Sequence, residues 1–269
     1  MYVRKNLVKE KLIKGEIVIG MEIWLRDPRI IELLGHAGFD YVHIENEHVA
    51  HNWETVENMI RTAELAGLTP LYRCEQCVDG QPPVNEIIKA LDCGAQIIKV
   101  PHVDTPDAAK KIVDAAKYPP LGRRGIATCN RGAIEIHPNE PSMPLDIKKF
   151  IQEANEEIML AVMIESPEAL KNIDKILDVD GIDVVGLGHQ DYAIAAGHTL
   201  DSGAEMDKVR DKVREAVQRK KGKYMWFSAA QPEMVEEERK RGTKIFLMAP
   251  DVILLNSVFR NLIKEVKVR

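Results

Sequence analysis

Two carboxylates, Glu165 and Asp191, have the residue type and the placement needed to bind a divalent cation. Residues 159–164 form an apolar run that ends at Glu165, and a second run at residues 182–187 ends shortly before Asp191. A helical pattern at residues 166–177 separates the runs, as in a βαβ unit. The carboxyl ends of parallel strands open on one edge, so the two side chains can meet there. Converging carboxylates repel each other unless they share a proton or bind a hard cation, and a cation is the leading hypothesis. The alternative is that Glu165 only caps the helix that follows it.

Further polar side chains follow other strand-like runs. Glu45, Glu47 and His48 come directly after residues 41–44, Arg73 ends the run at residues 70–73, and His189 precedes the second carboxylate. A neutral histidine can move a proton near neutral pH, and the planar fork of an arginine suits a substrate carboxylate. If these strand ends share one face of the fold, the sequence predicts a single site there.

An alternation of strand and helix patterns must position these side chains. Helix patterns follow the strand candidates without a composition shift that would mark a second domain, which predicts one (β/α)8 barrel over residues 1–269 with its site at the carboxyl ends of the strands. An open doubly wound sheet is the alternative, but Gly186-Leu187-Gly188 is not followed by a dinucleotide fingerprint. The eight strand candidates are residues 17–25, 41–44, 70–73, 96–100, 159–164, 182–187, 224–228 and 244–248. The helix candidates begin at Asp27-Pro28 and continue at residues 53–66, 83–91, 106–117, 145–154, 166–177, 206–220, 232–240 and from 250.

Composition excludes several classes of protein. A net charge of −5 and a pI near 6.0 provide no basic surface for nucleic acid. The N-terminus lacks the apolar core of a signal peptide and no run approaches a membrane span, so we expect a cytoplasmic protein. Cys74 and Cys77 have CxxC spacing, but no second pair completes a zinc ribbon, and we interpret them as loop thiols.

Short motifs are spread over nearly the whole chain: Phe39-Asp40-Tyr41 with Glu47-His48, Arg73, Gly94-Ala95-Gln96, Pro101-x-Val103, the segment PPLGRRG at 119–125, Ile164-Glu165, Gly181-Ile182-Asp183 and Gly188-x-x-Asp191. Together they resemble the HpcH/HpaI-type class II pyruvate aldolases, which include 4-hydroxy-2-oxoheptanedioate aldolase and 2-keto-3-deoxy sugar acid aldolases. The resemblance implies a lyase that cleaves a 4-hydroxy-2-oxo acid to pyruvate and an aldehyde through a metal-stabilised enolate.

The resemblance also implies roles for the site residues. Glu165 and Asp191 would bind Mg²⁺, Mn²⁺ or Co²⁺, and His48 would be the base, acting through a water beside the metal. Arg73 would hold the carboxylate of the 2-oxo acid, with Glu47 supporting these groups from behind. Members of the family are typically hexamers whose last helix packs on a neighbouring subunit. The apolar segment at residues 252–266 fits that arrangement, although a helix that closes its own barrel would have the same pattern.

The chain departs from the family pattern around the metal carboxylates. Glu45 stands where the family has an aspartate that pairs with the catalytic histidine, and Met163 replaces a glutamine. The loop before the second carboxylate reads Gly188-His189-Gln190-Asp191, and a serine-rich segment is replaced by residues 193–196, AIAA. These changes leave the residue types of the core roles intact and alter their polar surroundings.

The same residues allow other functions. A related enzyme would keep the enolate chemistry as a 2-oxo acid decarboxylase or an acyl-CoA lyase. A metal-free reaction would use Lys99, near the end of the run at residues 96–100, as a Schiff-base nucleophile. A barrel that has lost activity would only bind a 2-oxo acid.

Overall fold

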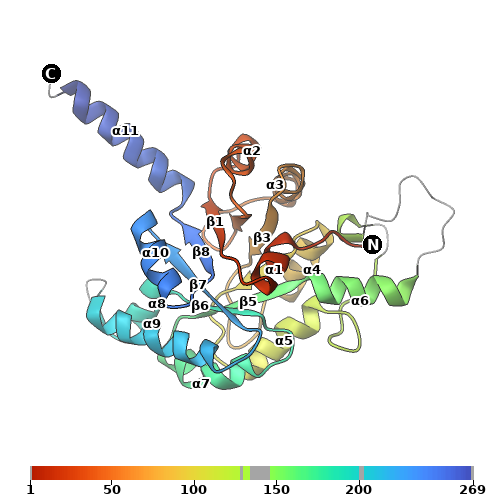
Figure 1. Cartoon of the computed structure of the whole chain (residues 1–269). Coiled ribbons are helices and arrows are strands. Elements are labelled where there is room, and N and C mark those ends of the chain that lie inside the picture. The colour runs from red at the N-terminus through yellow and green to blue at the C-terminus, as the bar shows by residue number, and fades with distance from the viewer. Residues whose placement is uncertain (1, 128–129, 134–145, 200–202, 268–269) are drawn as a thin grey trace.

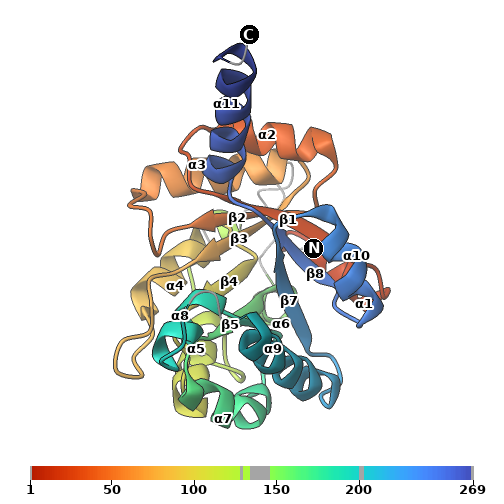
Figure 2. The ribbon, with the colours of Figure 1, turned by 90° about the vertical axis from the view of Figure 1, so that its left-hand side faces the viewer.

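The computed structural model describes residues 2–127, 130–133, 146–199 and 203–267. Its strands close into a barrel in chain order, and every neighbouring pair is parallel (Figures 1 and 2). The predicted (β/α)8 barrel is therefore confirmed, and the open doubly wound sheet is wrong. The strands are β1 Val18–Ile23, β2 Tyr41–Glu45, β3 Thr69–Arg73, β4 Ile97–Val100, β5 Met159–Ile164, β6 Val184–Leu187, β7 Tyr224–Ala229 and β8 Ile245–Met248.

The helices lie outside the barrel, and several begin where the sequence places both a cap and a proline. Asp27, Thr105 and Ser166 each accept the backbone N–H of a first-turn residue, and proline follows each of them at the first helical position. The helices are α1 Leu7–Ile13, α2 Pro28–Ala37, α3 Trp53–Leu65, α4 Val84–Asp92, α5 Pro106–Ala116, α6 Ile147–Glu157, α7 Pro167–Leu177, α8 His189–Ala195, α9 Gly203–Gln218, α10 Pro232–Lys240 and α11 Asp251–Lys267, with one 3-10 turn, η1 Arg131–Ala133.

Two helices were not predicted. Helix α1 precedes the first strand, in a segment where no helix was expected. The segment expected to be a loop around Gly188-x-x-Asp191 is instead the start of α8, so Asp191 lies in a first helical turn. A helix of only seven residues without a side-chain cap gives little sequence pattern to detect. Residues 118–144 are rich in proline, glycine and arginine and show little helix or strand pattern, which predicts a long irregular connection, and much of it lies outside the described residues.

The interior of the barrel is divided by chemistry. On β5 to β8 the inward side chains are apolar, as in Met159, Ala161, Val184 and Leu247. On β1 to β4 the inward positions nearest the carboxyl ends carry ionisable groups, each buried or nearly so: Glu22, His43, Glu45, Arg73 and Lys99. Strand register sets them side by side, because Glu22 pairs with His43, Glu45 with Arg73, and Arg73 with Lys99.

The last helix leaves the barrel at the same end. The Asp251 carboxylate accepts the backbone N–H groups of Trp24 and Leu25 at 3.0 and 3.1 Å, which anchors α11 beside the end of β1. Beyond that anchor α11 projects away from the other elements (Figures 1 and 2). It does not close its own barrel, so that alternative is wrong. No helix in the described part of the chain is both long and apolar enough to cross a bilayer. The large apolar side chains that α11 exposes are Ile253, Leu254, Leu255, Val258, Phe259, Leu262, Ile263 and Val266.

Candidate active site

The carboxylate of Glu45 organises the loop that carries His48. Glu45 ends β2 and is fully buried. Its Oε1 accepts the backbone N–H groups of Glu47 and His48 at 2.8 and 3.0 Å, and its Oε2 accepts from Nη1 of Arg73 at 3.1 Å. Glu45 therefore contacts the main chain of His48. It does not pair with the imidazole of His48, as the aspartate of the family would.

Arg73 is the cation around which the carboxylates gather. Its Nη2 pairs with Glu47 and lies 4.0 Å from Oε1 of Glu165, while Nη1 bonds to Glu45. Burial alone would lower the pKa of Arg73, but the charges of Glu45, Glu47 and Glu165 raise it, so the guanidinium remains charged. Two carboxylates already occupy the guanidinium, and N–H groups remain for a substrate carboxylate.

The imidazole of His48 faces the open side of this cluster. Its side chain is 51% exposed, and Nε2 lies 3.5 Å from Oε2 of Glu47. Its ring centroid is 6.5 Å from that of Trp24. Glu47, which was expected to support the site from behind, thus contacts both His48 and Arg73 directly. Burial raises the pKa of Glu47, with Glu165 and Glu45 adding to the effect. A histidine that is accessible to solvent and held next to a carboxylate can accept and release a proton.

Glu165 holds a carboxylate oxygen with no hydrogen-bond partner. The residue follows β5, and its Oε2 accepts the backbone N–H of His102 at 2.7 Å. Its Oε1 is buried and makes no hydrogen bond within the described residues. Burial raises the pKa of this carboxyl group. Ser166 supplies the cap of α7, so the alternative in which Glu165 caps that helix is wrong.

Asp191 approaches Glu165 from the next strand along the barrel. Its charge is one of the causes that raise the pKa of Glu165. The chain between them passes close to the carboxylate, because a Cβ at Gly188 would lie 2.3 Å from Oε1 of Glu165. A buried carboxylate oxygen that makes no hydrogen bond among the described residues, with a second carboxylate nearby, fits a hard divalent cation.

His102 is a site residue that the sequence reasoning missed. It follows β4 within the Pro101-x-Val103 motif, where it was treated only as a variable position. Its φ of +54° lies in the left-handed region, which aims its N–H at Glu165. Its Nε2 lies 3.9 Å from a carboxylate oxygen of both Glu47 and Glu165. A histidine after a strand was the available signal, but its backbone conformation cannot be read from the sequence.

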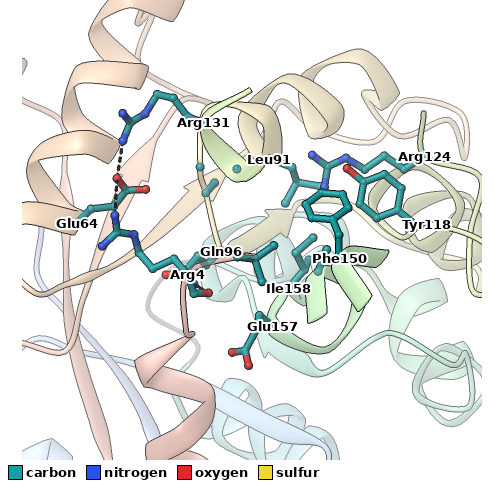
Figure 3. Close-up of a pocket in the computed structure, with 15 residues that line it drawn as sticks. Arg4, Glu64, Leu91, Gln96, Tyr118, Arg124, Arg131, Phe150, Glu157 and Ile158 are labelled. Atoms are coloured by element: carbon teal, nitrogen blue, oxygen red, sulfur yellow. Dashed lines mark hydrogen bonds and ion pairs between the residues drawn. The ribbon is translucent and has the colours of Figure 1, made fainter. Parts of the chain in front are cut away.

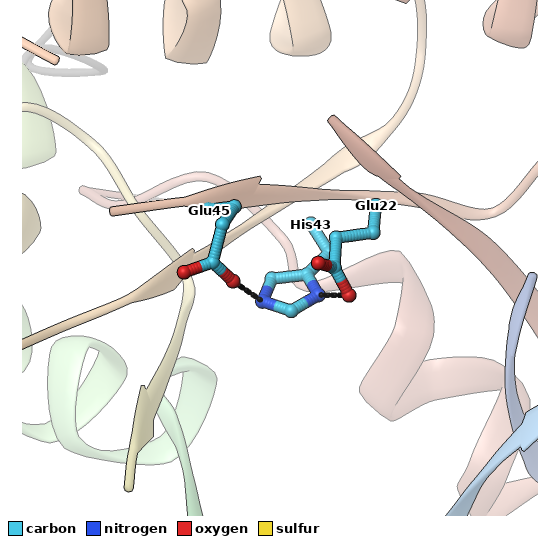
Figure 4. A group of neighbouring side chains, drawn as sticks. All are labelled: Glu22, His43 and Glu45. Atoms are coloured by element: carbon cyan, nitrogen blue, oxygen red, sulfur yellow. Dashed lines mark ion pairs between the residues drawn. The ribbon is translucent and has the colours of Figure 1, made fainter. Parts of the chain in front are cut away.

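A second acidic group lies deeper in the barrel. Glu22, His43 and Glu45 are the described residues whose potential ligand atoms fall within 4.8 Å of one another, so they form a possible metal site (Figure 4). Lys99 lies beyond them, with its Nζ 4.2 Å from the centroid of the Trp226 ring. Burial and the charge of Arg73 lower the pKa of Lys99 to about 8.

A pocket at the other end of the barrel does not share this chemistry. It is lined by residues that precede β4 and β5, including Gln96 and Ile158 (Figure 3). Its arginines are engaged in ion pairs, since Arg4 and Arg131 both contact Glu64.

The two cysteines of the CxxC segment are unsuited to redox chemistry. Cys74 and Cys77 are free and buried, and burial raises the pKa of both thiols.

The carboxyl ends of the barrel strands carry clustered carboxylates, an arginine and an accessible histidine. This arrangement is typical of an enzyme active site in a (β/α)8 barrel. The sequence profile of the HpcH/HpaI aldolase/citrate lyase family matches residues 19–257. The chain belongs to this family, and it is a lyase.

Relatives and solved structures agree with this assignment. The 2-keto-3-deoxy-L-rhamnonate aldolase of Escherichia coli O6:K15:H31 is 30% identical over 251 residues, which cover 93% of this chain and 88% of the aldolase. An HpcH/HpaI aldolase from Desulfitobacterium hafniense superposes with a TM-score of 0.86 at 29% identity, covering 97% of this chain and 96% of that one. The citrate synthase SbnG superposes with a TM-score of 0.82 at 28% identity, covering 98% and 97%.

Proposed function

We propose that this enzyme is a divalent-metal-dependent aldolase that cleaves a 4-hydroxy-2-oxo acid into pyruvate and an aldehyde. The observation that carries the proposal is the buried Oε1 of Glu165, which makes no hydrogen bond among the described residues and has the charge of Asp191 nearby. Glu165 and Asp191 would hold Mg²⁺, Mn²⁺ or Co²⁺. When bound, the cation supplies Lewis-acid polarisation of the substrate carbonyl. Because of the similarity to 2-keto-3-deoxy-L-rhamnonate aldolase, 2-keto-3-deoxy sugar acids are the substrates to test first.

The other residues divide the remaining work. Arg73 binds the carboxylate of the 2-oxo acid, which fixes the carbon chain relative to His48. His48 takes the proton of the 4-hydroxyl group as the carbon–carbon bond breaks, and Glu47, 3.5 Å from its Nε2, stabilises the imidazolium that forms. His102 lines the same opening and would contact the substrate beside Glu165.

The test uses pyruvate alone, so it does not depend on the unknown aldehyde. With Mn²⁺ or Mg²⁺ in D₂O, the enzyme should exchange the methyl protons of pyruvate, followed by proton NMR. The His48→Ala variant should exchange them about 10²-fold more slowly, as expected for loss of a positioned general base. A wild-type protein that binds metal and leaves the methyl signal unchanged would favour the binding-barrel alternative.

Two further measurements separate the remaining alternatives. Borohydride reduction with pyruvate would trap a Schiff base on Lys99, whereas sensitivity to a chelator supports the metal-dependent reaction. Turnover of oxaloacetate or of an acyl-CoA substrate, with no cleavage of 4-hydroxy-2-oxo acids, would favour a decarboxylase or an acyl-CoA lyase.

We also infer that the enzyme is a homo-oligomer in which α11 packs on another copy of the chain, a hexamer if it follows its family. The support is the projection of α11 and its exposed apolar side chains, such as Phe259 at 59% exposure. Light scattering should show that Phe259→Glu dissociates the assembly, whereas Asn256→Glu, an equally drastic change at an exposed polar position of the same helix, should be tolerated better.

A further inference from the structure

The loop that follows β4 is fastened to the end of β5 by hydrogen bonds. Ser166 donates its hydroxyl to Oδ1 of Asp104 at 2.5 Å, and Asn172 donates its side-chain amide to the backbone carbonyl of Asp104 at 2.8 Å. The backbone N–H of His102 donates to Oε2 of Glu165 at 2.7 Å. These contacts fix the position of His102 relative to the Glu165 carboxylate.

The backbone of His102 has a conformation that residues other than glycine seldom adopt. Its φ of +54° lies in the left-handed region, and strained positions of this kind gather at functional sites. The hydrogen bonds of the loop hold the backbone in this conformation. The side chain of His102 is 31% exposed, so a ligand can reach the imidazole from solvent.

The imidazole lies next to two carboxylates without bonding to either. Nε2 of His102 is 3.9 Å from Oε1 of Glu47 and 3.9 Å from Oε2 of Glu165. A hydrogen bond would need about 3.2 Å or less, so neither contact is one. Two atoms that each bind one ion at about 2.1 Å are separated by about 3 Å on adjacent positions and by about 4.2 Å on opposite positions. The separation between Nε2 and the Glu165 carboxylate lies within this range.

The other basic side chains of the site lie at a different oxygen of Glu47. Arg73 pairs with Oε2 of Glu47, and Nε2 of His48 is 3.5 Å from the same oxygen. His102 instead faces Oε1 of Glu47 and, in the described part of the chain, is the histidine with a ring nitrogen close to Glu165. It is therefore the histidine best placed to share a ligand with Glu165.

His102 and Glu165 form a pair and not a closed site. Within the described residues, no third histidine, cysteine or carboxylate has a ligand atom within 4.8 Å of both. The side chain of Asp191 would have to turn toward them to bind the same ion. The positions that remain are those that a catalytic ion keeps open for water and substrate.

We propose that His102 binds the divalent cation through Nε2, together with the carboxylates of Glu165 and Asp191. The inference rests on the proposed function, because it concerns the cation assigned to those carboxylates. A nitrogen ligand changes the preference among ions, since imidazole favours the later transition metals and oxygen ligands suit Mg²⁺. The site should therefore prefer Co²⁺ over Mg²⁺ more strongly than carboxylates alone would.

Pulsed EPR of Mn²⁺ bound to the protein tests the ligand without substrate or turnover. A bound imidazole gives a nitrogen coupling, which should change from the ¹⁴N to the ¹⁵N pattern in protein labelled with ¹⁵N-histidine. We expect this coupling in the wild type and its loss in His102→Asn. Asparagine tolerates the left-handed backbone, so the variant keeps the loop and removes the imidazole. His102→Gly, which also accepts this backbone, should give the same loss.

Two other histidines provide matched controls. His48 lies at Oε2 of Glu47, and burial lowers the pKa of His189, whose charged neighbours are Arg210 and Asp207 on α9. His48→Gln and His189→Gln should both retain the nitrogen coupling of bound Mn²⁺.

Calorimetry gives a second readout. Outer contacts of a metal site already change affinity by about 10- to 100-fold, so His102→Asn should lower Co²⁺ affinity at least about 10-fold and Mg²⁺ affinity less. Equal losses for the two ions would contradict a nitrogen ligand. A nitrogen coupling that is absent from the wild type, or that persists in His102→Asn, would overturn the proposal. If Mn²⁺ binding in that case still depends on Glu165, the proposed function stands, whereas a wild type that binds no Mn²⁺ would end both.

Discussion

The two halves of the barrel interior differ in the charge of their side chains, and we call them the charged half (β1 to β4) and the apolar half (β5 to β8). Strands β1 to β4 bring Glu22, His43, Glu45, Arg73 and Lys99 inward, whereas β5 to β8 fill the same space with apolar side chains such as Met159 and Trp226. In the charged half Arg73 pairs with Glu45 on the neighbouring strand, and His43 lies between Glu22 and Glu45, whereas Lys99 lies over the ring of Trp226. The apolar half contributes Glu165 and Asp191 only at the rim.

The difference separates two uses of a buried carboxylate. Glu45 is surrounded by donors, so it supports other groups and has no oxygen free for a ligand. In Glu165 one oxygen accepts the backbone N–H of His102 and the other makes no hydrogen bond among the described residues, which fits the cation site proposed above. Under the proposed function, Glu45 in the charged half positions other groups, whereas Glu165 and Asp191 at the rim of the apolar half would bind the cation.

The largest expected effect comes from removing the rim carboxylates. Glu165→Ala or Asp191→Ala should abolish Mn²⁺ binding measured by calorimetry, because one carboxylate alone cannot offset desolvation of the cation. Pyruvate proton exchange should fall by roughly 10³-fold, similar to the loss of a strong electrostatic contact in other active sites.

Glu168→Ala is the control for this prediction, since Glu168 is an exposed carboxylate in the first turn of α7. It should bind Mn²⁺ as the wild type does. If Glu165→Ala also binds Mn²⁺ with unchanged affinity, the metal lies elsewhere and the assignment of Glu165 as its ligand is wrong.

Lys99→Met removes a charge from the charged half and should stabilise the protein in a pH-dependent way. Burial and Arg73 lower the pKa of Lys99 from 10.5 to about 8, a difference worth about 3 kcal/mol. Below pH 8 both the folded and the unfolded chain bind this proton, so the full cost is present and the variant should be more stable by up to that amount. Between pH 8 and 10.5 the folded wild type releases the proton first, so its stability rises with pH and the advantage of the variant disappears.

Urea denaturation at several pH values measures this difference. Lys117 also has its pKa lowered to about 8 by burial, so only the difference between wild type and variant is informative. Lys89→Met is the matched control, because Lys89 lies over the ring of Trp53 at 5.4 Å but is exposed. Its effect should not change between pH 7 and 10.

The sequence was sufficient to predict the rim of the site better than its interior. Glu47, Arg73 and Glu165 could be identified because each ends or follows a strand, and a barrel brings strand ends together. Glu22 and His43 were missed because they lie within strands, where alternation alone does not reveal that a charged residue points inward next to another one.

Other features depended on tertiary structure that no local pattern contains. The left-handed backbone at His102 turns an unremarked position into a contact of Glu165. The apolar pattern of α11 is the same whether the helix covers its own barrel or a neighbour, and only the fold shows that it projects from its own. To pair with the imidazole of His48, the longer side chain of Glu45 would have to fold back, but its Oε1 instead accepts the main-chain N–H groups of Glu47 and His48.

Arg73→Lys should have a smaller effect than loss of the rim carboxylates. A point charge replaces the planar fork, so lysine cannot bond Glu45, Glu47 and a substrate carboxylate together. The pyruvate concentration that half-saturates proton exchange should rise about 10-fold, while Mn²⁺ affinity stays nearly constant. An unchanged pyruvate dependence would place Arg73 outside the substrate site and assign it wholly to the positioning of Glu45 and Glu47.

The smallest effect is expected at the outer end of the charged half, where Trp24 donates its indole N–H to Glu22. Trp24→Phe keeps an aromatic ring next to His48 but removes this donor, so the free energy of unfolding should fall by about 1 kcal/mol, the usual net value of one hydrogen bond. Trp53→Phe is the control, because Trp53 stacks on Tyr72 and its indole makes no hydrogen bond in the described part of the chain. Urea denaturation should therefore show a larger loss for Trp24→Phe. Equal losses in the two variants would mean that the indole N–H of Trp24 does not stabilise Glu22. The interactions that stabilise the charged half would then extend only as far as His43 and would not reach the rim of the barrel.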